Sequence, residues 1–262
     1  MSSDIFIPSS PNLSLAWAEA FIRVMGRGVT ELSPLVITVT DIADEVPVES
    51  KEIRQTLDAQ LRRLDLQSCH TVANTIFPES MWNPNSSNDA DQLFQRFERA
   101  WPRIRRCPAN HRGSYFRRLT AYCPSGSDES VNQLEHVVNT YRKGNHRRSA
   151  LQASVFDPTR DHNDCRQLGF PCLHQVAFTP IGSQGLSVTG FYATQFLLER
   201  AYGNYLGLCR LGRFMAKQMG LTFEKMICIA SVAQRGAPTK TQLQPLTNEL
   251  AAILAKAGEA QA

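Results

Sequence analysis

Apolar residues recur at every third or fourth position in several parts of the chain, which is the spacing of helices that bury one face. This period predicts helices at about residues 15–25, 53–64, 93–104 and 131–143. A longer run with the same period, 197–219, predicts one long and largely buried helix. In the tail, residues 246–258 predict a final helix with Thr247 as its N-cap.

Strand signals lie between and after these helices. Alternating residues at 35–40 predict one strand, the stretch 152–194 is β-like, and ICIASV from Ile227 predicts a buried strand. The loops that join the elements are too short to be interdomain linkers. Helices mixed with mostly non-alternating strands predict an α+β fold, with a single domain over residues 1–262.

The composition is that of an ordinary soluble globular protein. The chain has 262 residues, 42% hydrophobic and 20% charged, which is enough to bury a core without disulfides. Its apolar runs fall far short of the roughly 20 residues that cross a bilayer, and its start lacks the regions of a signal peptide. Seven cysteines without a CxxC pair favour reduced thiols. We therefore expect a cytoplasmic protein without membrane association.

Positive charge is unevenly distributed, although the net charge is only +4. Basic residues gather in two segments, Arg103, Arg105, Arg106, Arg112, Arg117 and Arg118 in the first, and Arg142, Lys143, His146, Arg147 and Arg148 in the second. Each segment is either a solvated face or a site for phosphate or carboxylate, whose oxygens match the guanidinium fork. Because arginine outnumbers lysine in both, the anion site is slightly favoured.

Cys172 lies in GFPCLHQ between two predicted strands, two residues before His174. A thiolate is a strong nucleophile once cations lower its pKa, but a cysteine in an apolar stretch is more often an inert core residue. With His162 and Cys165, these residues make a set of zinc-ligand types. Their spacing, H-x2-C-x6-C-x-H, matches no common structural zinc site, so we expect no metal.

No Walker loop, GxGxxG, HExxH or GxSxG motif occurs, which argues against the common classes that use them. Four other segments follow one another along the chain: GRGVTEL, NQLEHVVNTYRKGNHRRSAL, FPCLHQVAF and YATQFLLERAYGNYLGLCRLGRFMA. In this order they resemble the thymidylate synthase superfamily, particularly its archaeal-type and nucleotide hydroxymethylase-like branches. The last segment is the most specific, because Asn204, Leu208, Leu211 and Ala216 fall where the family has the same residue types.

The resemblance implies a mixed central sheet with flanking helices and a long buried helix after the catalytic strands. It also implies that Cys172 attacks C6 of a pyrimidine nucleotide, whose C5 then takes a one-carbon unit from methylenetetrahydrofolate. Asn204 would pair with the N3–H and carbonyl edge of a uracil-like ring. Arg27 would bind the nucleotide phosphate. Arg147 and Arg148 would reach the phosphate of the other subunit's nucleotide, so a homodimer is expected.

Two further residues fit the resemblance more loosely. Tyr115, in HRGSYFRRL, matches the family's Gly-x-x-Tyr region and would face the active site, although a packed interface tyrosine is an equal alternative. Glu79, in IFPESMW, is a candidate for the catalytic glutamate. We expect these two residues to lie near the cysteine if the enzyme interpretation holds.

Departures from the family fall in the substrate pocket. Ala193 and Thr194 stand where the family has an Arg-Ser pair, which removes a phosphate contact. Phe196 replaces an aspartate that helps to hold the ring and the folate, and ICIASVAQRG lacks the family's sugar-binding His and Tyr. Arg200 lies nearby and could replace the lost charge, but on a helix it need not point the same way.

These departures leave several functions open. The first is a methyltransferase or hydroxymethyltransferase acting on a pyrimidine. The second is a catalytically altered protein that binds or senses nucleotides. The third is a scaffold subunit that acts with a partner on an unusual or nucleic-acid substrate. The fourth is RNA binding through the arginine segments, with an affinity that falls steeply with salt.

Overall fold

The computed structural model describes residues 8–42, 47–111, 113–124, 129–162, 164 and 170–259. The helices are α1 (Leu13–Met25), α2 (Lys51–Arg63), α3 (Cys69–Ile76), α4 (Asp89–Ile104), α5 (Tyr115–Thr120), α6 (Gln133–Lys143), α7 (Pro158–Asp161), α8 (Tyr202–Met219) and α9 (Lys240–Glu259). The strands are β1 (Ser9–Ser10), β2 (Glu31–Leu32), β3 (Leu35–Val39), β4 (Gln152–Ser154), β5 (Leu173–Ile181), β6 (Gly185–Phe196) and β7 (Thr222–Gln234). Among the described helices, none is long and apolar enough to cross a membrane.

The strands form one mixed sheet in the order β1-β3-β7-β6-β5-β4, with β2 paired to β7. The pairs β1–β3 and β6–β7 are parallel, whereas β3–β7, β5–β6 and β4–β5 are antiparallel. Because one mixed sheet is combined with helices that pack on it, such as α1 and α8, the structure agrees with the predicted α+β class.

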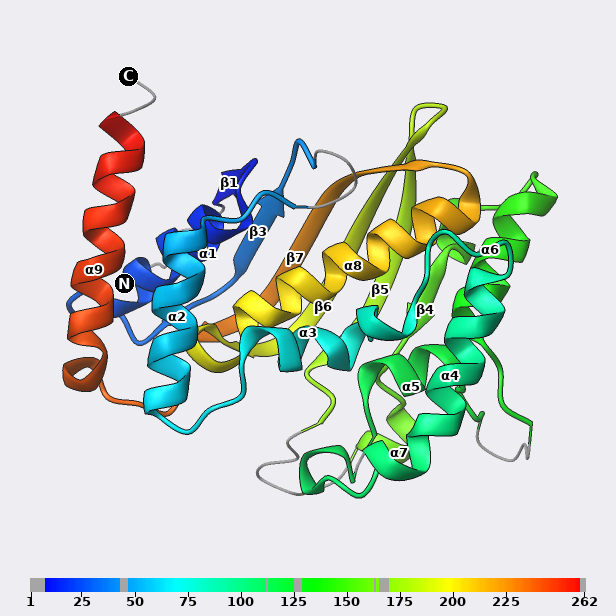
Figure 1. Cartoon of the computed structure of the whole chain (residues 1–262), viewed down its shortest axis with the longest axis horizontal. Coiled ribbons are helices and arrows are strands. Elements are labelled where there is room, and N and C mark those ends of the chain that lie inside the picture. Colours follow the sequence, from blue (N-terminus) through cyan, green and yellow to red (C-terminus); the bar gives the residue numbers. More distant parts are fainter. Residues whose placement is uncertain are drawn as a thin grey trace.

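The two faces of the sheet differ in cover. Helix α8 crosses one face of the sheet (Figure 1). Gly190, the cross-strand partner of Cys228, points to this face. Helix α8 comes so close that a Cβ on Gly190 would lie 2.7 Å from Leu208. The next pair along, Phe191 and Ile229, points to the opposite face. That row is partly exposed, Phe191 by 37%, so the core lies on the α8 side.

Helix α3 packs directly against α8. A Cβ on Gly203 of α8 would lie 2.5 Å from the Cβ of Val72 and 2.7 Å from the Cys69 carbonyl oxygen, so the contact depends on glycine. Ser68 caps α3 by accepting a hydrogen bond from the Thr71 N–H at 3.2 Å. The apolar period does not reveal α3 because the helix is only 8 residues long.

The C-terminal helix starts earlier than the sequence predicts. The predicted N-cap Thr247 lies inside α9, where its hydroxyl donates to the Leu243 carbonyl at 2.9 Å. The helix is capped instead by Thr239, whose hydroxyl accepts from the Gln242 N–H at 3.3 Å while the Gln242 side chain accepts from the Thr239 N–H at 2.8 Å. The predicted start is wrong because it followed the apolar period and missed this T-x-x-Q capping box.

Candidate active site

Cys172 immediately precedes β5 and lies beside the end of β6, where its carbonyl oxygen accepts a hydrogen bond from the Ala193 N–H at 3.2 Å. Its side chain is half-buried. Burial raises the pKa of the Cys172 thiol, and the positive charge of Arg200 acts in the opposite direction. Since burial prevails, the resting thiol is mostly protonated at neutral pH.

Tyr115 is the first residue of α5 and stacks on Phe170 with a ring-centroid distance of 5.2 Å. Burial raises the pKa of its hydroxyl, while the nearby backbone N–H groups of Cys172 and Leu173 and the charge of Arg200 lower it. The structure therefore brings Tyr115 to Cys172. A protonated phenol here can donate a hydrogen bond to a ligand.

Tyr192 on β6 pairs with Leu173 and is fully buried. Within the described part of the chain, its hydroxyl has no hydrogen-bond partner. Burial and the neighbouring Cys228, Tyr115 and Cys172 raise the pKa of this hydroxyl. A buried polar group without a partner costs about 1–3 kcal/mol, so it marks a place where a ligand can supply the missing bond. The available sequence signal was a tyrosine near the end of a strand, which identifies no role.

Asn204 lies in the first turn of α8 and is 3% exposed. Its side chain forms no hydrogen bond with any described residue. By contrast, the adjacent Tyr205 donates to Gln195 at 2.9 Å, and Gln195 lies 3.6 Å from the sulfur of Cys228. The Asn204 amide therefore retains a donor and an acceptor for a ligand.

Arg200 belongs to a π-helical turn, Leu197–Ala201, that joins β6 to α8. Its side chain is exposed, and Nη1 donates to Gln67 Oε1 at 2.6 Å. Its charge lowers the pKa of both Cys172 and Tyr115, so the three side chains lie within electrostatic reach of one another. Single π-helical turns often occur at functional sites.

The predicted phosphate-binding arginines have no described contact with this group. Arg27 is exposed in the turn after α1, and Arg147 and Arg148 are exposed after α6. No described contact joins any of the three to Cys172. Their roles in binding phosphate therefore stay predictions.

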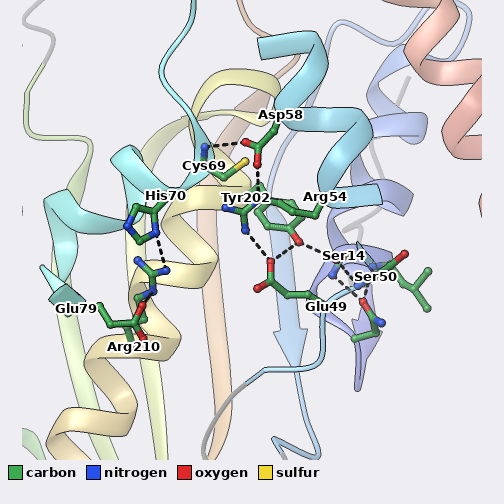
Figure 2. Close-up of polar contacts among 12 residues, drawn as sticks. Ser14, Glu49, Ser50, Arg54, Asp58, Cys69, His70, Glu79, Tyr202 and Arg210 are labelled. Carbon is green, nitrogen blue, oxygen red and sulfur yellow. Dashed lines mark hydrogen bonds and ion pairs between the residues drawn. The ribbon is translucent and has the colours of Figure 1, made fainter. Parts of the chain in front are cut away.

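Glu79 belongs to a different polar network, shown in Figure 2. It forms an ion pair with Arg210 of α8 at 3.0 Å, and Arg210 also bonds His70 at 3.0 Å and Asn74 at 3.2 Å. No described contact links Glu79 to Cys172. The structure therefore gives Glu79 a partner in the helical layer, and its catalytic role stays a prediction.

Two members of the first arginine segment have structural partners. Arg118 is buried and forms a bidentate pair with Asp161 at 2.8 and 2.9 Å, and it also donates to the Val155 carbonyl at 2.9 Å. Arg117 pairs with Glu98. These contacts account for part of the predicted basic cluster without a ligand. Arg112 lies outside the described residues.

The described residues of the zinc-like pattern do not form a metal-binding group. His174 stacks on Phe156 with a centroid distance of 4.6 Å, and burial lowers its pKa. Cys165 lies outside the described residues. Within the part that is described, no group of three or more His, Cys, Asp or Glu side chains could hold a metal ion.

A cavity of about 220 Å³ lies away from Cys172, between the start of α4, α6 and the end of α8. Asp89 in its wall accepts hydrogen bonds from Trp82 at 2.7 Å, Lys217 at 2.8 Å and Gln218 at 3.0 Å. Asp89 is therefore held by hydrogen bonds within the chain. The chemistry points to Cys172 instead.

A scan of protein-family models and a comparison with curated proteins find no match to this chain. The functional argument therefore depends on the residues and on their arrangement around Cys172.

Proposed function

We propose that the protein transfers a one-carbon unit to C5 of a uracil-like pyrimidine nucleotide through a covalent Cys172 adduct, in the manner of thymidylate synthases. The observation that supports this most is the grouping of the thiol with Tyr115, Arg200 and the unpartnered Tyr192 hydroxyl. A nucleophile beside a cation and open hydrogen-bonding groups is the arrangement that covalent catalysis requires.

The chemistry follows from the thiol. The Cys172 thiolate bonds to ring C6, and the electrons of the C5–C6 double bond move toward C5 and the C4 oxygen. Carbon C5 then bonds to the one-carbon unit and gives up its proton to a base, and departure of the thiolate restores the C5–C6 double bond. Transfer would be complete once the bond from the carbon to its carrier nitrogen breaks, with water giving a hydroxymethyl product or hydride from the reduced folate giving a methyl product. Tyr115 and Asn204 offer donors to the negative charge that develops on the ring.

Methylenetetrahydrofolate is the one-carbon donor that the resemblance implies, and it would supply the carbon at the oxidation level of formaldehyde. Phe196 replaces the family's aspartate and is 42% exposed. A phenyl ring can stack on a pterin but cannot hydrogen-bond its edge. The fit to this donor is therefore partial, and the thiol addition depends only on the chain's own residues.

A homodimer belongs to the same proposal. Phe191 and Ile229 lie in the partly exposed row on the sheet face opposite α8, and a second copy would cover this row. Arg147 and Arg148 are exposed and available to a nucleotide phosphate on a neighbouring subunit. The dimer would thus supply cations that one chain does not bring to Cys172.

A second candidate is a protein that binds or senses nucleotides without turnover, alone or as a scaffold subunit for a nucleic-acid substrate. Two observations favour it. Burial raises the pKa of the Cys172 thiol, and Ala193 and Thr194 place no cation at the end of β6. Binding through Tyr192 and Asn204 would then remain while the nucleophile stays protonated.

Covalent trapping separates the two candidates. The protein is incubated with 5-fluoropyrimidine nucleotides, free and within nucleic acid, together with methylenetetrahydrofolate, and its intact mass is measured. We expect an adduct that is lost in Cys172→Ser and kept in Cys107→Ser, which alters an exposed thiol. Nucleotide binding without an adduct supports the sensor. Neither binding nor adduct overturns both.

A further inference from the structure

The proposed reaction leaves the arginines of α4 and of the turn after it without a role. Farther along the chain, Arg118 is buried in its pair with Asp161, and Arg117 pairs with Glu98. The arginines that remain in this part of the described chain are exposed, and they are Arg96, Arg99, Arg103, Arg105 and Arg106. None of these side chains forms an ion pair with a described residue. The fold alone therefore does not account for this concentration of positive charge.

Three of these arginines form a stripe along α4. Arg96, Arg99 and Arg103 are separated by three and four residues, so their side chains leave the helix on one face. Leu93 and Phe97 lie on a different face, which is buried in the core. The helical rise separates successive arginines by about 4.5 and about 6 Å along the axis. The stripe is therefore a row of guanidinium groups on the solvent side of the helix.

The sequence of α4 keeps negative charge away from this stripe. Within the helix, the positions three and four residues from each arginine hold another arginine or one of the uncharged residues Gln92, Leu93, Gln95, Ala100 and Pro102. Like charges at these spacings destabilise a helix. Phosphates bound along the stripe would replace this repulsion with attraction, which is the charge complementarity expected of a polyanion site.

Helix α4 presents the stripe on a fixed support. At its start, Asp89 accepts hydrogen bonds from Trp82 at 2.7 Å and from Lys217 at 2.8 Å. In its middle, Phe97 contacts Phe116 of α5 edge to face, with a ring-centroid distance of 4.7 Å. The helix lies beside α5, at the end of the molecule opposite α9 (Figure 1). A ligand can therefore bind the row of arginines without a rearrangement of the backbone.

The chemistry of the stripe favours phosphate over other anions. Residues 89–118 contain no lysine, and the guanidinium group differs from an ammonium in binding two phosphate oxygens at once. A nucleic-acid strand presents phosphates at regular intervals, whereas the carboxylates of an acidic peptide follow its own sequence. A membrane surface is disfavoured because the described part of α4 exposes no large apolar side chain that could insert into lipid.

We propose that the stripe of Arg96, Arg99 and Arg103, extended by Arg105 and Arg106, binds the phosphate backbone of a nucleic-acid strand. The stripe reads charge and spacing, so binding does not depend on base identity. This inference goes beyond the proposed function because it requires neither Cys172 nor a pyrimidine base. It gives the exposed arginines an interaction surface that is separate from the reaction.

Binding is measured by fluorescence anisotropy with a labelled oligo(dA) of about 20 nucleotides, which contains no pyrimidine. We expect the triple variant Arg96→Gln/Arg99→Gln/Arg103→Gln to weaken binding about tenfold or more at low salt. The slope of log K against log salt should fall by about 2, since each phosphate contact on a single strand contributes about 0.7. The control Arg62→Gln/Arg63→Gln/Lys256→Gln removes the same charge from exposed positions of α2 and α9 and should leave the slope unchanged. Thermal unfolding checks that both variants are folded.

Competitors test the class of partner. Unlabelled duplex DNA should displace oligo(dA) from the wild-type protein, whereas polyglutamate and vesicles containing phosphatidylserine should displace it poorly. Equal salt slopes in the wild type and the triple variant overturn the proposal, and so does polyglutamate or vesicle binding tighter than oligo(dA) binding. Cys172→Ser should bind oligo(dA) as the wild type does. If oligo(dA) binds but no pyrimidine adduct forms in the trapping experiment, the arginine surface stands and the proposed reaction fails.

Discussion

Two polar regions flank the start of α8, and they differ in whether their buried hydrogen-bonding groups have partners. In the network of Figure 2, Arg54 bonds Glu49 and Asp58 at 2.8 Å each, and the Tyr202 hydroxyl lies 2.6 Å from Glu49 and 2.7 Å from Ser14. Beside Cys172, by contrast, the buried Tyr192 hydroxyl lacks a partner among the described residues. Both regions are rich in polar side chains, but only the second is incomplete.

This difference separates a structural network from a binding site better than residue type does. The Figure 2 network contains a cysteine, a histidine and two arginines, which a motif search would favour. Its polar groups form hydrogen bonds and ion pairs with one another, and these bonds stabilise the contacts between α2, α3 and α8. Beside Cys172, the Tyr192 hydroxyl is buried without a hydrogen bond, which costs free energy of folding. Such a group is expected where a ligand supplies the missing hydrogen bond.

The largest expected effect comes from breaking a complete pair that borders the site. Arg118 and Asp161 have side chains only 9% and 5% exposed. Arg118→Ala leaves the Asp161 charge buried without its partner, and we expect a loss of about 3–5 kcal/mol of unfolding free energy. Urea denaturation measures this loss. The exposed Arg99→Ala is the control and should stay within about 0.5 kcal/mol; equal effects of the two changes would contradict the structural role.

A smaller loss is expected in the Figure 2 network. Arg210→Ala removes the partners of Glu79 and His70 and should cost about 2 kcal/mol, since hydrogen bonds to charged groups contribute about 1.5–3 kcal/mol each and Glu79 is partly solvated. Glu79→Gln should cost less than this. Neither variant should change the rate at which iodoacetamide alkylates Cys172. A loss of pyrimidine adduct in Glu79→Gln with normal stability would instead support the predicted catalytic role.

Two tyrosines provide a matched comparison of paired and unpaired hydroxyls. Tyr202→Phe removes a hydroxyl that bonds Glu49 and Ser14, and we expect it to lower the free energy of unfolding by about 1–2 kcal/mol. Tyr192→Phe removes a hydroxyl without a partner, so stability should stay constant or rise by up to about 1 kcal/mol. Thermal and urea unfolding of both variants measure the difference. A larger loss in Tyr192→Phe than in Tyr202→Phe would mean that the Tyr192 hydroxyl is satisfied in the native protein.

Much of the fold could be predicted because the longer helices and the strand at 35–40 show regular spacing of apolar residues along the sequence. The apolar spacing predicts α1, α2, α4, α6 and α8, and the alternation at 35–40 predicts β3. Short elements such as α3 escape because two helical turns carry too few positions for a period to emerge. The start of α9 depends on a reciprocal hydrogen bond between Thr239 and Gln242, which periodicity cannot express.

The site could be predicted only in part. The resemblance predicts Cys172 and Tyr115 as site residues, and the structure places the Tyr115 hydroxyl near the backbone N–H groups of Cys172 and Leu173, while their roles stay predictions. The position of Arg200 depends on the π-helical turn, which shifts side-chain directions without any change in apolar spacing. Whether the Tyr192 hydroxyl has a hydrogen-bond partner depends on which groups surround it in the folded chain. A missing hydrogen-bond partner results from tertiary packing, so it cannot be predicted from the sequence.

The smallest expected effect concerns pH and the paired network. Burial, followed by the charge of Arg210, lowers the pKa of His70, and the charge of Glu79 only partly offsets this. The unfolded chain therefore takes up its proton first as pH falls below about 6.5, and stability is lost as pH falls further through the folded-state pKa. We expect His70→Gln, which can still accept from Arg210, to lose less stability than wild type between pH 7.5 and 5.5, whereas His136→Gln should behave as wild type. The hydrogen bond and charge of Arg54 lower the pKa of the Asp58 carboxyl. This carboxyl therefore titrates below about pH 4, outside the pH range of the experiment. Identical pH dependence in wild type and His70→Gln would show that His70 is not held neutral by the network.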